Sequence, residues 1–377
     1  MWSLLLILSC STKATNTPAS ADSEDESDTS ISLPVPENGY QLVTPTYEVP
    51  PFTEEEICTV IQLEPRADEQ MYWVNSMESL VTDGTHHMNV LIGEFSFLDA
   101  FAGDGASEAA LGVPEGQYPC SELETMELAY TIFPSQRDNQ RITMPPGVAA
   151  PMTAPLMVIF SHHYVNAQDT PIEISAILNI ETIPKEEVTE VAGLVFDDIP
   201  DLEVPPGTDR VVSRNCIFER DVNVALVSTH NHEWGECATI NHFDGETDSI
   251  TAEPFFVNKQ WEQPPILHFE PETFSIKAGD GVNWSCHFRN DTDRTLINDG
   301  TAEGEMCVFA AVTYPSPWTV AEVEETIGSG DLAGLLTLMG DVMGPCDSTS
   351  APSQDPWPTD DAGACEPFEQ TESNVLE

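Results

Sequence analysis

Residues 222–232 read "VNVALVSTHNH", a strand-length run of mostly apolar residues that ends in two histidines. Successive side chains on a strand point to opposite faces, so Val222, Val224 and Leu226 share one face with His230 and His232. Similar runs, rich in Val and Ile, recur between Pro, Gly, Asn and Asp turn signals. They are ICTVIQL (57–63), MNVLIGEF (88–95), LMVIFSHHYVNA (156–167), IEISAILNIETIP (172–184), FSIKAGDGVNW (274–284) and MCVFAAVTYP (306–315). This pattern predicts an all-β fold of antiparallel, jelly-roll-like β-sandwiches.

Changes in composition and in the spacing of apolar residues along the chain predict its domain organisation. A weak boundary between about 183 and 193 divides it into two β-sandwich domains, 34–187 and 188–318. After Pro317 the apolar residues recur at the spacing of an α-helix, and Thr319 and Glu322 have the spacing of a capping box. We therefore expect two short helices within 319–346, packed on the second domain. Residues 11–33, rich in Ser, Thr and acid, are predicted to form a disordered tether, and 347–377 an acidic disordered tail.

The charge balance excludes one class of partner. The 377 residues include 12 Lys+Arg and 65 Asp+Glu, for a formal net charge of -53. Such a surface repels phosphate backbones, so nucleic acid is not expected as a partner. The excess acid indicates either a heavily hydrated surface suited to salty water or specific binding of a cationic partner.

The N-terminus indicates export. Residues 1–10, "MWSLLLILSC", resemble a bacterial lipoprotein signal in which Cys10 would be acylated, although a basic n-region is missing and the apolar run is short. A mis-annotated start codon would explain the shortness. We therefore expect an exported protein, a lipoprotein at the cell envelope or a secreted one, that meets the membrane only through such an anchor.

Eight cysteines remain beyond Cys10, and an even number in an exported chain favours disulfides. Eight cysteines allow 105 pairings, so spacing alone does not fix the connectivity. Zinc ligation is the alternative, but the sequence contains no CxxC pair.

Six of the nine histidines fall in three clusters, which scattered surface histidines would not do. His230 and His232, on one strand face, could hold one metal ion together or could be hydrogen-bonded edge residues. The adjacent histidines His86-His87 and His162-His163 would face opposite sides of a regular strand. Joint ligation by His86 and His87 therefore needs a distorted strand end, and we expect only one residue of the second pair to face a site.

Four short motifs occur in one order: "HHM" at 86–88, "HY" at 163–164, "HNH" at 230–232 and "EMC" at 305–307. In this order, on a chain of this texture, they resemble the copper type II, ascorbate-dependent monooxygenases, the family of peptidylglycine α-hydroxylating monooxygenase and dopamine β-monooxygenase. The resemblance covers roughly residues 40 to 346. It implies one copper held by His86, His87 and His163, and a second, catalytic copper held by His230, His232 and Met306.

A thioether favours Cu(I), whereas imidazole serves both oxidation states, so the asymmetry suits an O2-activating site beside an electron-accepting one. Zinc would also fit three histidines, but a Met ligand argues against it.

The same resemblance implies three disulfides, Cys58–Cys120, Cys286–Cys307 and Cys216–Cys346. Cys237 and Cys365 have no counterpart in the family pattern.

By resemblance, the expected activity is hydroxylation of a C–H bond with O2, with ascorbate as the electron donor and two copper ions as cofactors. The peptide-amidating members hold their substrate's carboxylate at positions that here are Ser228, Val308 and Ala310. We therefore expect a small, uncharged or hydrophobic substrate rather than a peptidylglycine. The alternative is a non-catalytic copper-binding or copper-handling lipoprotein on the same scaffold. The sequence does not indicate an oligomeric state.

Overall fold

The computed structural model describes residues 31–66, 71–93, 114–123, 129–251, 253–299, 304–330, 332–344 and 346–350. Ile31–Glu377 belong to one compact unit. In the described ranges, no helix is both long and apolar enough to cross a membrane. The predicted signal and lipobox (1–10) lie outside the described residues, as do most of the tether and the tail beyond residue 350.

The fold is all-β, as the sequence predicts, with two short helices near its C-terminal end. No described strand pairing joins residues 39–191, here called the first half, to residues 193–350, the second half. The sheets therefore divide within the boundary region expected from the sequence. The division into two folding domains stays a prediction.

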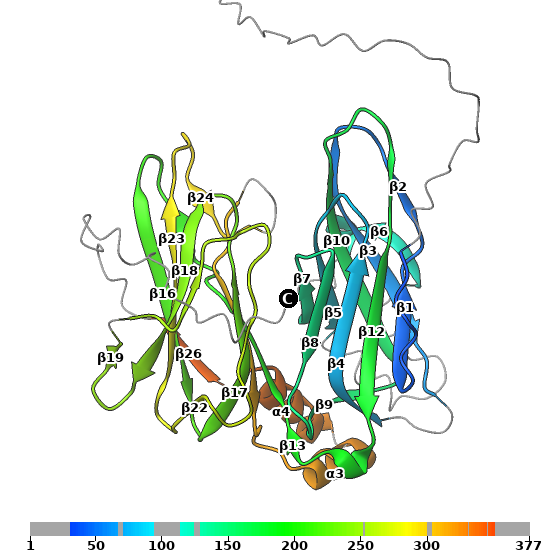
Figure 1. Ribbon diagram of the computed structural model, residues 1–377, viewed down its shortest axis with the longest axis vertical. Coiled ribbons are helices and arrows are strands. Elements are labelled where there is room, and N and C mark those ends of the chain that lie inside the picture. The colour runs from blue at the N-terminus through cyan, green and yellow to red at the C-terminus, as the bar shows by residue number, and fades with distance from the viewer. Residues whose placement is uncertain are drawn as a thin grey trace, which may run out of the picture. The chain divides into compact units, whose positions relative to one another are not determined.

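The first half contains two large sheets and one small one (Figure 1). One sheet has the order β1 (Gly39–Val43), β12 (Ala176–Ile183), β4 (Met71–Val81), β9 (Val148–Thr153) and β13 (Glu190–Val191), with β8 (Asn139–Thr143) also on β4. The second has the order β6 (Gly116–Pro119), β3 (Thr53–Leu63), β10 (Leu156–Asn166), β5 (Thr85–Gly93) and β7 (Ala129–Ser135). The small sheet pairs β11 (Ile172–Ile174) with β2 (Tyr47–Val49). All of these pairings are antiparallel except β13 with β9. Single 3-10 turns occur at Cys120–Glu122 and Lys185–Glu187.

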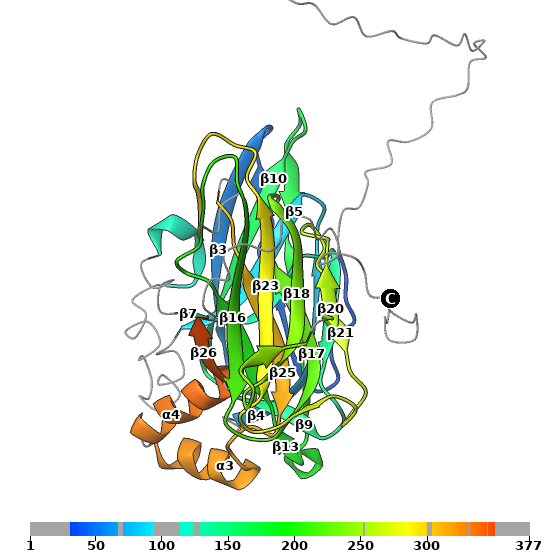
Figure 2. The same ribbon diagram turned by 90° about the vertical axis from the view of Figure 1, so that its left-hand side faces the viewer.

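The second half repeats this arrangement (Figure 2). One sheet has the order β14 (Gly193–Asp198), β25 (Val308–Tyr314), β17 (Val222–His230) and β21 (Leu267–His268), with β22 (Ser275–Ile276) also on β17. The other has the order β19 (Ser249–Ile250), β18 (Gly235–Asp244), β23 (Gly281–Arg289), β16 (Asp209–Phe218) and β26 (Cys346–Ser350), with β20 (Phe256–Asn258) on β18. β15 (Glu203–Val204) pairs with β24 (Leu296–Ile297).

Each half buries apolar side chains from both of its large sheets. In the first half, Val74 of β4 shares a core with Val158 and Phe160 of β10. In the second half, Phe309 of β25 shares a core with Trp284 of β23. Burial of this apolar surface, at roughly 25 cal/mol per Å², is the main force that holds each pair of sheets together. β10 is buried along nearly its whole length because it lies between β3 and β5, which explains its continuous apolar sequence.

The three disulfides implied by the family resemblance are all present: Cys58–Cys120, Cys216–Cys346 and Cys286–Cys307. Cys237 is disulfide-bonded as well. The Cys286–Cys307 bridge joins β23 to the residue just before β25, so it links the two large sheets of the second half. These bonds fit an oxidising compartment.

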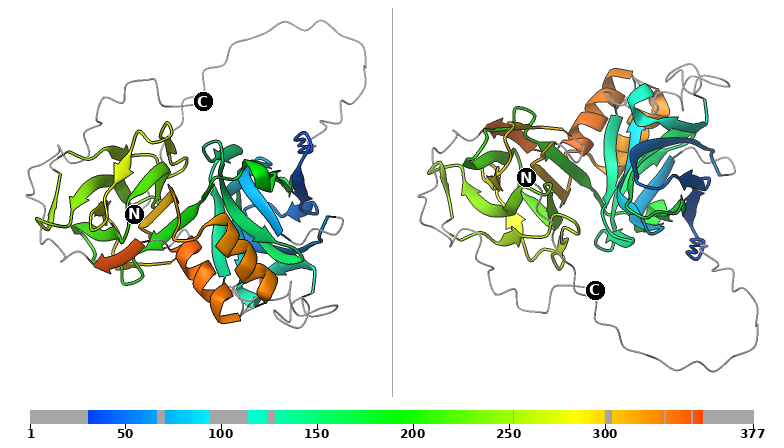
Figure 3. Two further views of the ribbon diagram at one scale, coloured as in Figure 1. Left: turned by 90° about the horizontal axis from the view of Figure 1, so that it is seen from below. Right: turned by 90° about the horizontal axis from the view of Figure 1, so that it is seen from above.

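Two helices follow β25, α3 (Val320–Ser329) and α4 (Leu332–Met343), and Figure 3 shows them side by side. The predicted capping box is confirmed, because Thr319 and Glu322 bond reciprocally at the start of α3. The sequence predicts these helices on the second domain, but their buried side chains share a core with Trp73, Ala149 and Val191 of the first half. α4 also contacts β14. The reason is that β25 ends opposite the start of β14, at the junction of the halves, so the helices that follow β25 contact both halves.

The start of the predicted disordered tail is ordered instead. Cys346–Ser350 form β26, which pairs with β16 from Arg214 to Phe218. The Cys216–Cys346 bond holds the two strands together, a constraint that the polar composition of this segment does not reveal.

Candidate metal centre

A break in strand register brings three histidines of the first half together. On β5 and β10, His87 lies opposite His163, whereas the next pair is Thr85 with Tyr164. His86 is therefore the extra residue of a β-bulge, and a bulge turns a side chain away from strict alternation. The distorted strand that joint ligation by His86 and His87 requires is thus present.

The three rings converge. The potential ligand atoms of His86, His87 and His163 all lie within 4.8 Å of one another. The Nδ1 atoms of His86 and His87 are 3.0 Å apart. His162 is not part of the group, because its Nε2 bonds to the Thr85 hydroxyl at 2.6 Å. Only one member of the His162-His163 pair faces the site, as expected.

The hydrogen bonds of His163 leave one ring nitrogen available. Its Nε2 lies 3.1 Å from the Glu54 carboxylate, to which it donates. Its Nδ1 is buried and has no hydrogen-bond partner. A buried polar atom without a partner is costly, and a carboxylate that fixes the opposite nitrogen is the usual support of a metal-binding histidine. The burial, free lone pair and fixed orientation of His163 Nδ1 are therefore those expected of a metal ligand.

The second histidine group lies at the end of β17. His230 is the last residue of that strand, His232 follows, and their ring centroids are 5.0 Å apart. His230 Nδ1 lies 2.8 Å from Gln136 Oε1, and His232 Nδ1 lies 3.2 Å from the Gly304 carbonyl oxygen. Both acceptors are carbonyl oxygens, so each Nδ1 donates and each Nε2 keeps its lone pair for a metal.

Met306 is placed beside this pair by strand pairing. β25 pairs with β17 so that Val308 lies opposite His230, and Met306 lies two residues before Val308. Met306 and His230 line the same cavity. The disulfide at Cys307 fixes the backbone next to Met306. His230 thus lies beside His232 and shares a cavity wall with Met306.

Four of these imidazoles are held neutral. Burial, followed by nearby histidines, lowers the pKa of His86 to about 4 and that of His230 to about 3. Burial is also the main cause that lowers the pKa of His87, far below its usual value, and that of His232. Neutral rings keep the lone pairs that metal coordination requires.

Glu305 organises the loop of the second group, a role that was not predicted from the sequence. Its side chain is fully buried and accepts hydrogen bonds from the backbone N–H groups of His232 at 2.9 Å, Trp234 at 2.8 Å and Met306 at 3.2 Å. Burial raises the pKa of Glu305 to about 7, against the lowering effect of these backbone bonds. The signal was present in the "EMC" motif, where a carboxylate directly precedes a buried strand.

Gly235 closes the same turn because only glycine fits there. A Cβ at this position would lie 2.0 Å from the Asn231 amide nitrogen, which donates to the Gly235 carbonyl oxygen. The sequence Asn231 to Gly235 thus forms a compact turn that carries His232.

The two groups lie next to each other. The ring centroids of His87 and His230 are 6.3 Å apart. Gln136, from the first half, bonds His230 and also donates to the Trp261 carbonyl oxygen at 3.4 Å. The Trp261 ring lies 5.7 Å from that of His86. Gln136 and Trp261 therefore tie the halves together at the histidines, and nothing in their local sequence marks them.

A cavity of about 240 Å³, here called the metal-flanking cavity, adjoins both groups. His87, His230 and Met306 line it. Ser228, Val308 and Ala310, the positions expected to contact the substrate, line it as well. No Lys or Arg is among its described lining residues, and its one carboxylate, Glu56, accepts a hydrogen bond from Ser161. The described lining therefore offers no cationic side chain to pair with an anionic substrate.

The comparisons with known proteins identify no family. Neither a model of a known protein family nor a curated protein matches the sequence. Among solved structures, a protein of Sulfolobus Turreted Icosahedral Virus aligns over 74% of this chain and 60% of its own, with 12% identity and a TM-score of 0.20. A protein from Parabacteroides distasonis aligns over 74% of this chain and 89% of its own, with 9% identity and a TM-score of 0.15. Scores this low carry no argument about fold or function.

Proposed function

We propose that this chain is an exported dicopper monooxygenase that uses O2 and a reductant such as ascorbate to hydroxylate a C–H bond. The observation that carries the proposal is the state of the ring nitrogens. In the first group, His163 Nδ1 is buried without a partner, and one ring nitrogen from each of His86, His87 and His163 lies within 4.8 Å of the others. In the second, the Nδ1 atoms of His230 and His232 are occupied, which leaves both Nε2 atoms available.

The donor types favour copper over zinc. Three imidazoles suit zinc or copper, but a thioether beside two imidazoles favours Cu(I). His86, His87 and His163 would hold one ion, and His230, His232 and Met306 the other. When bound, copper would supply one-electron chemistry with O2, with one oxygen atom entering the substrate and the other leaving as water.

The chain's own residues orient the ligands and position the substrate. Glu54 and Gln136 hold the rings of His163 and His230 by hydrogen bonds, and Glu305 holds the backbone that carries His232 and Met306. A molecule bound in the metal-flanking cavity would lie beside Met306 and His230, which supports a role of this cavity in substrate binding. Its small and uncharged lining at Ser228, Val308 and Ala310 favours an uncharged or hydrophobic substrate.

Copper stoichiometry and ascorbate-dependent O2 uptake test the proposal directly. We expect two copper ions per chain and O2 consumption that requires ascorbate. Aromatic amines, which are uncharged at neutral pH, should be better substrates than a glycine-extended peptide, and efficient amidation of the peptide would contradict the substrate class. Copper binding without O2 uptake would instead support a copper-handling role.

Substitutions at Met306 should impair the second metal group and leave the first unaffected. Met306→Leu keeps the volume but removes the sulfur, and Met306→His supplies an imidazole instead. Both should abolish hydroxylation while the copper held by three histidines remains bound. X-ray absorption of the Cu(I) protein should lose its sulfur scatterer in both variants, and retention of that scatterer would show that Met306 is not a ligand.

Export also belongs to this proposal. The disulfides fit an oxidising compartment, and acylation at Cys10 would anchor the chain at the cell envelope. Mass spectrometry of the native N-terminus would test for the lipid.

A further inference from the structure

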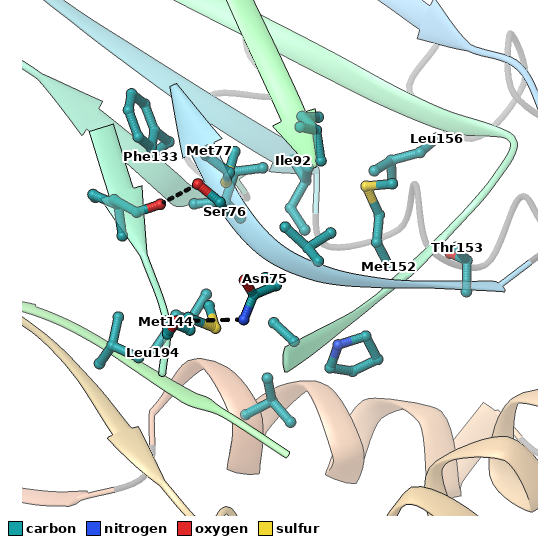
Figure 4. Close-up of a pocket in the computed structure, with 18 of the residues that line it drawn as sticks. Asn75, Ser76, Met77, Ile92, Phe133, Met144, Met152, Thr153, Leu156 and Leu194 are labelled. Carbon is teal, nitrogen blue, oxygen red and sulfur yellow. Dashed lines mark hydrogen bonds between the residues drawn. The ribbon is translucent and has the colours of Figure 1, made fainter. Parts of the chain in front are cut away.

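A second cavity, of about 130 Å³, lies mainly within the first half (Figure 4). Here it is called the apolar cavity. Side chains from both large sheets line it, among them Val74 of β4, Phe133 of β7 and Leu156 of β10. Val312 of β25 and Met339 of α4 complete the wall. None of its described lining residues is charged, so its occupant must be uncharged.

Two of the polar residues in its wall already have partners. The Asn75 amide nitrogen donates to the carbonyl oxygens of Met144, Pro145 and Val148 at 2.7 to 3.4 Å. The Ser76 hydroxyl donates to the Ile142 carbonyl oxygen at 3.1 Å. Figure 4 marks bonds of both residues. Neither group requires a ligand.

Thr153 differs from these two residues. It is 3% exposed, it lines the cavity, and its hydroxyl oxygen is buried without a hydrogen-bond partner. Buried hydroxyls without partners are uncommon because losing the bond to water costs about 1–3 kcal/mol. The cavity thus combines an apolar wall with one available hydroxyl, the usual composition of a small-molecule site.

The apolar cavity and the metal-flanking cavity share part of their walls. Ile132, Ile142, Leu194 and Val312 line both. Ile132, Ile142 and Leu194 are only half-buried. A molecule held in the apolar cavity therefore lies beside the cavity that contains His230 and Met306.

We propose that the apolar cavity binds an uncharged, ring-sized apolar group that carries one hydroxyl or carbonyl, with Thr153 as its hydrogen-bond partner. The size supports this assignment, since an apolar cavity of roughly 150 Å³ in another protein accepts benzene or xenon. That this group is the non-reacting end of the substrate rests on the proposed monooxygenase function.

Fluorine NMR of the metal-free, full-length protein tests the site. The probes are 4-fluorophenol and fluorobenzene, which differ in one hydroxyl. We expect both to bind, with 4-fluorophenol tighter. Thr153→Val keeps the shape and removes the hydroxyl, so it should weaken 4-fluorophenol roughly tenfold and leave fluorobenzene unchanged.

Two further variants control for indirect effects. Ala150→Leu places a larger side chain in the cavity wall and should abolish binding of both probes. Thr182→Val, a change on β12 outside the cavity, should alter neither affinity. If Ala150→Leu does not fold, the comparison of Thr153→Val with Thr182→Val still decides the result. Absence of binding at millimolar probe, or equal loss of both probes in Thr153→Val, would overturn the proposal.

Bound copper then tests whether the apolar cavity lies next to the proposed substrate site. In protein shown to hold Cu(II), the fluorine signal of bound 4-fluorophenol should broaden because the paramagnetic ion lies beside the shared wall. Binding without broadening would separate the cavity from the substrate site. A protein that binds the probes but neither binds copper nor consumes O2 would refute the proposed function and leave the apolar site standing.

Discussion

The two histidine groups are built in different ways. In the first half, two paired strands hold all three histidines, and a bulge at His86 directs two neighbouring residues to one site. In the second half, β17 ends at His230, a turn bonded to Glu305 supplies His232, and the segment before β25 supplies Met306. The first group is thus fixed mainly by sheet pairing and the second by a buried carboxylate, a disulfide and a contact from the other half.

The available ring nitrogens differ as well. In the first group, Nδ1 of His163 has no partner and its Nε2 bonds to Glu54, whereas the Nδ1 atoms of His86 and His87 bond to each other. The second presents Nε2 atoms, with both Nδ1 positions bonded. Each group therefore depends on a different set of supporting contacts, so it should be possible to remove one metal ion without the other.

The largest expected effect comes from removing a ligand in either group. His163→Ala should lower the stoichiometry from two copper ions to one by loss of the ion in the first group. His232→Ala should do the same for the second. Cu(II) electron paramagnetic resonance would report which site remains, and the loss of both ions in either variant would show that the groups are not independent.

Removal of the Glu305 carboxylate should have the next largest effect. Glu305→Ala leaves buried N–H groups of His232, Trp234 and Met306 without an acceptor, which should lower the free energy of unfolding by about 3 kcal/mol. The second copper should be lost with the turn, and the first retained. Chemical denaturation and metal analysis measure the two effects. Glu236→Ala, at a half-exposed carboxylate in a surface ion pair with Arg289, is the matched control and should change stability little.

A smaller effect is expected at Gln136, which supports His230 from the other half of the chain. Gln136→Leu keeps the bulk but removes the acceptor for His230 Nδ1. Loss of such a support usually weakens metal binding by 10- to 100-fold. Copper titration should show this loss at the second site alone. Equal weakening of both sites would indicate that Gln136 acts by holding the halves together.

The smallest effect is expected at Glu54. Glu54→Gln keeps an acceptor for His163 Nε2 but removes the charge, and the side chain is 46% exposed, so water already screens it. Copper affinity of the first group should fall only a few fold. A loss as large as that of Gln136→Leu would mean that the charge at Glu54, rather than ring orientation, supports the site.

Much of this structure follows from local sequence. Apolar runs such as residues 156–167 predict strands because side-chain alternation and β-branched residues favour extended backbone. Thr319 and Glu322 predict the start of α3 because the capping box needs only four consecutive residues. The family resemblance implied that His86, His87 and His163 lie together, and it implied the three disulfides.

The rest depended on contacts between distant residues. The bulge at His86 arises from pairing with β10, about 77 residues along the chain. The support of His230 by Gln136 joins residues 94 positions apart. The helices contact the first half as well as β14 of the second, because β25 ends at the junction of the halves.

The sequence by itself therefore determined the β-rich fold, the start of α3 and the identity of the clustered histidines, because each rests on short-range geometry or on residue chemistry. The tertiary structure alone decided which ring nitrogens are available, that Glu305 carries the turn of the second group, and that Thr153 is left without a partner in an apolar cavity. These features depend on which groups remain unbonded after the sheets have packed, and that is set by partners far apart in the chain.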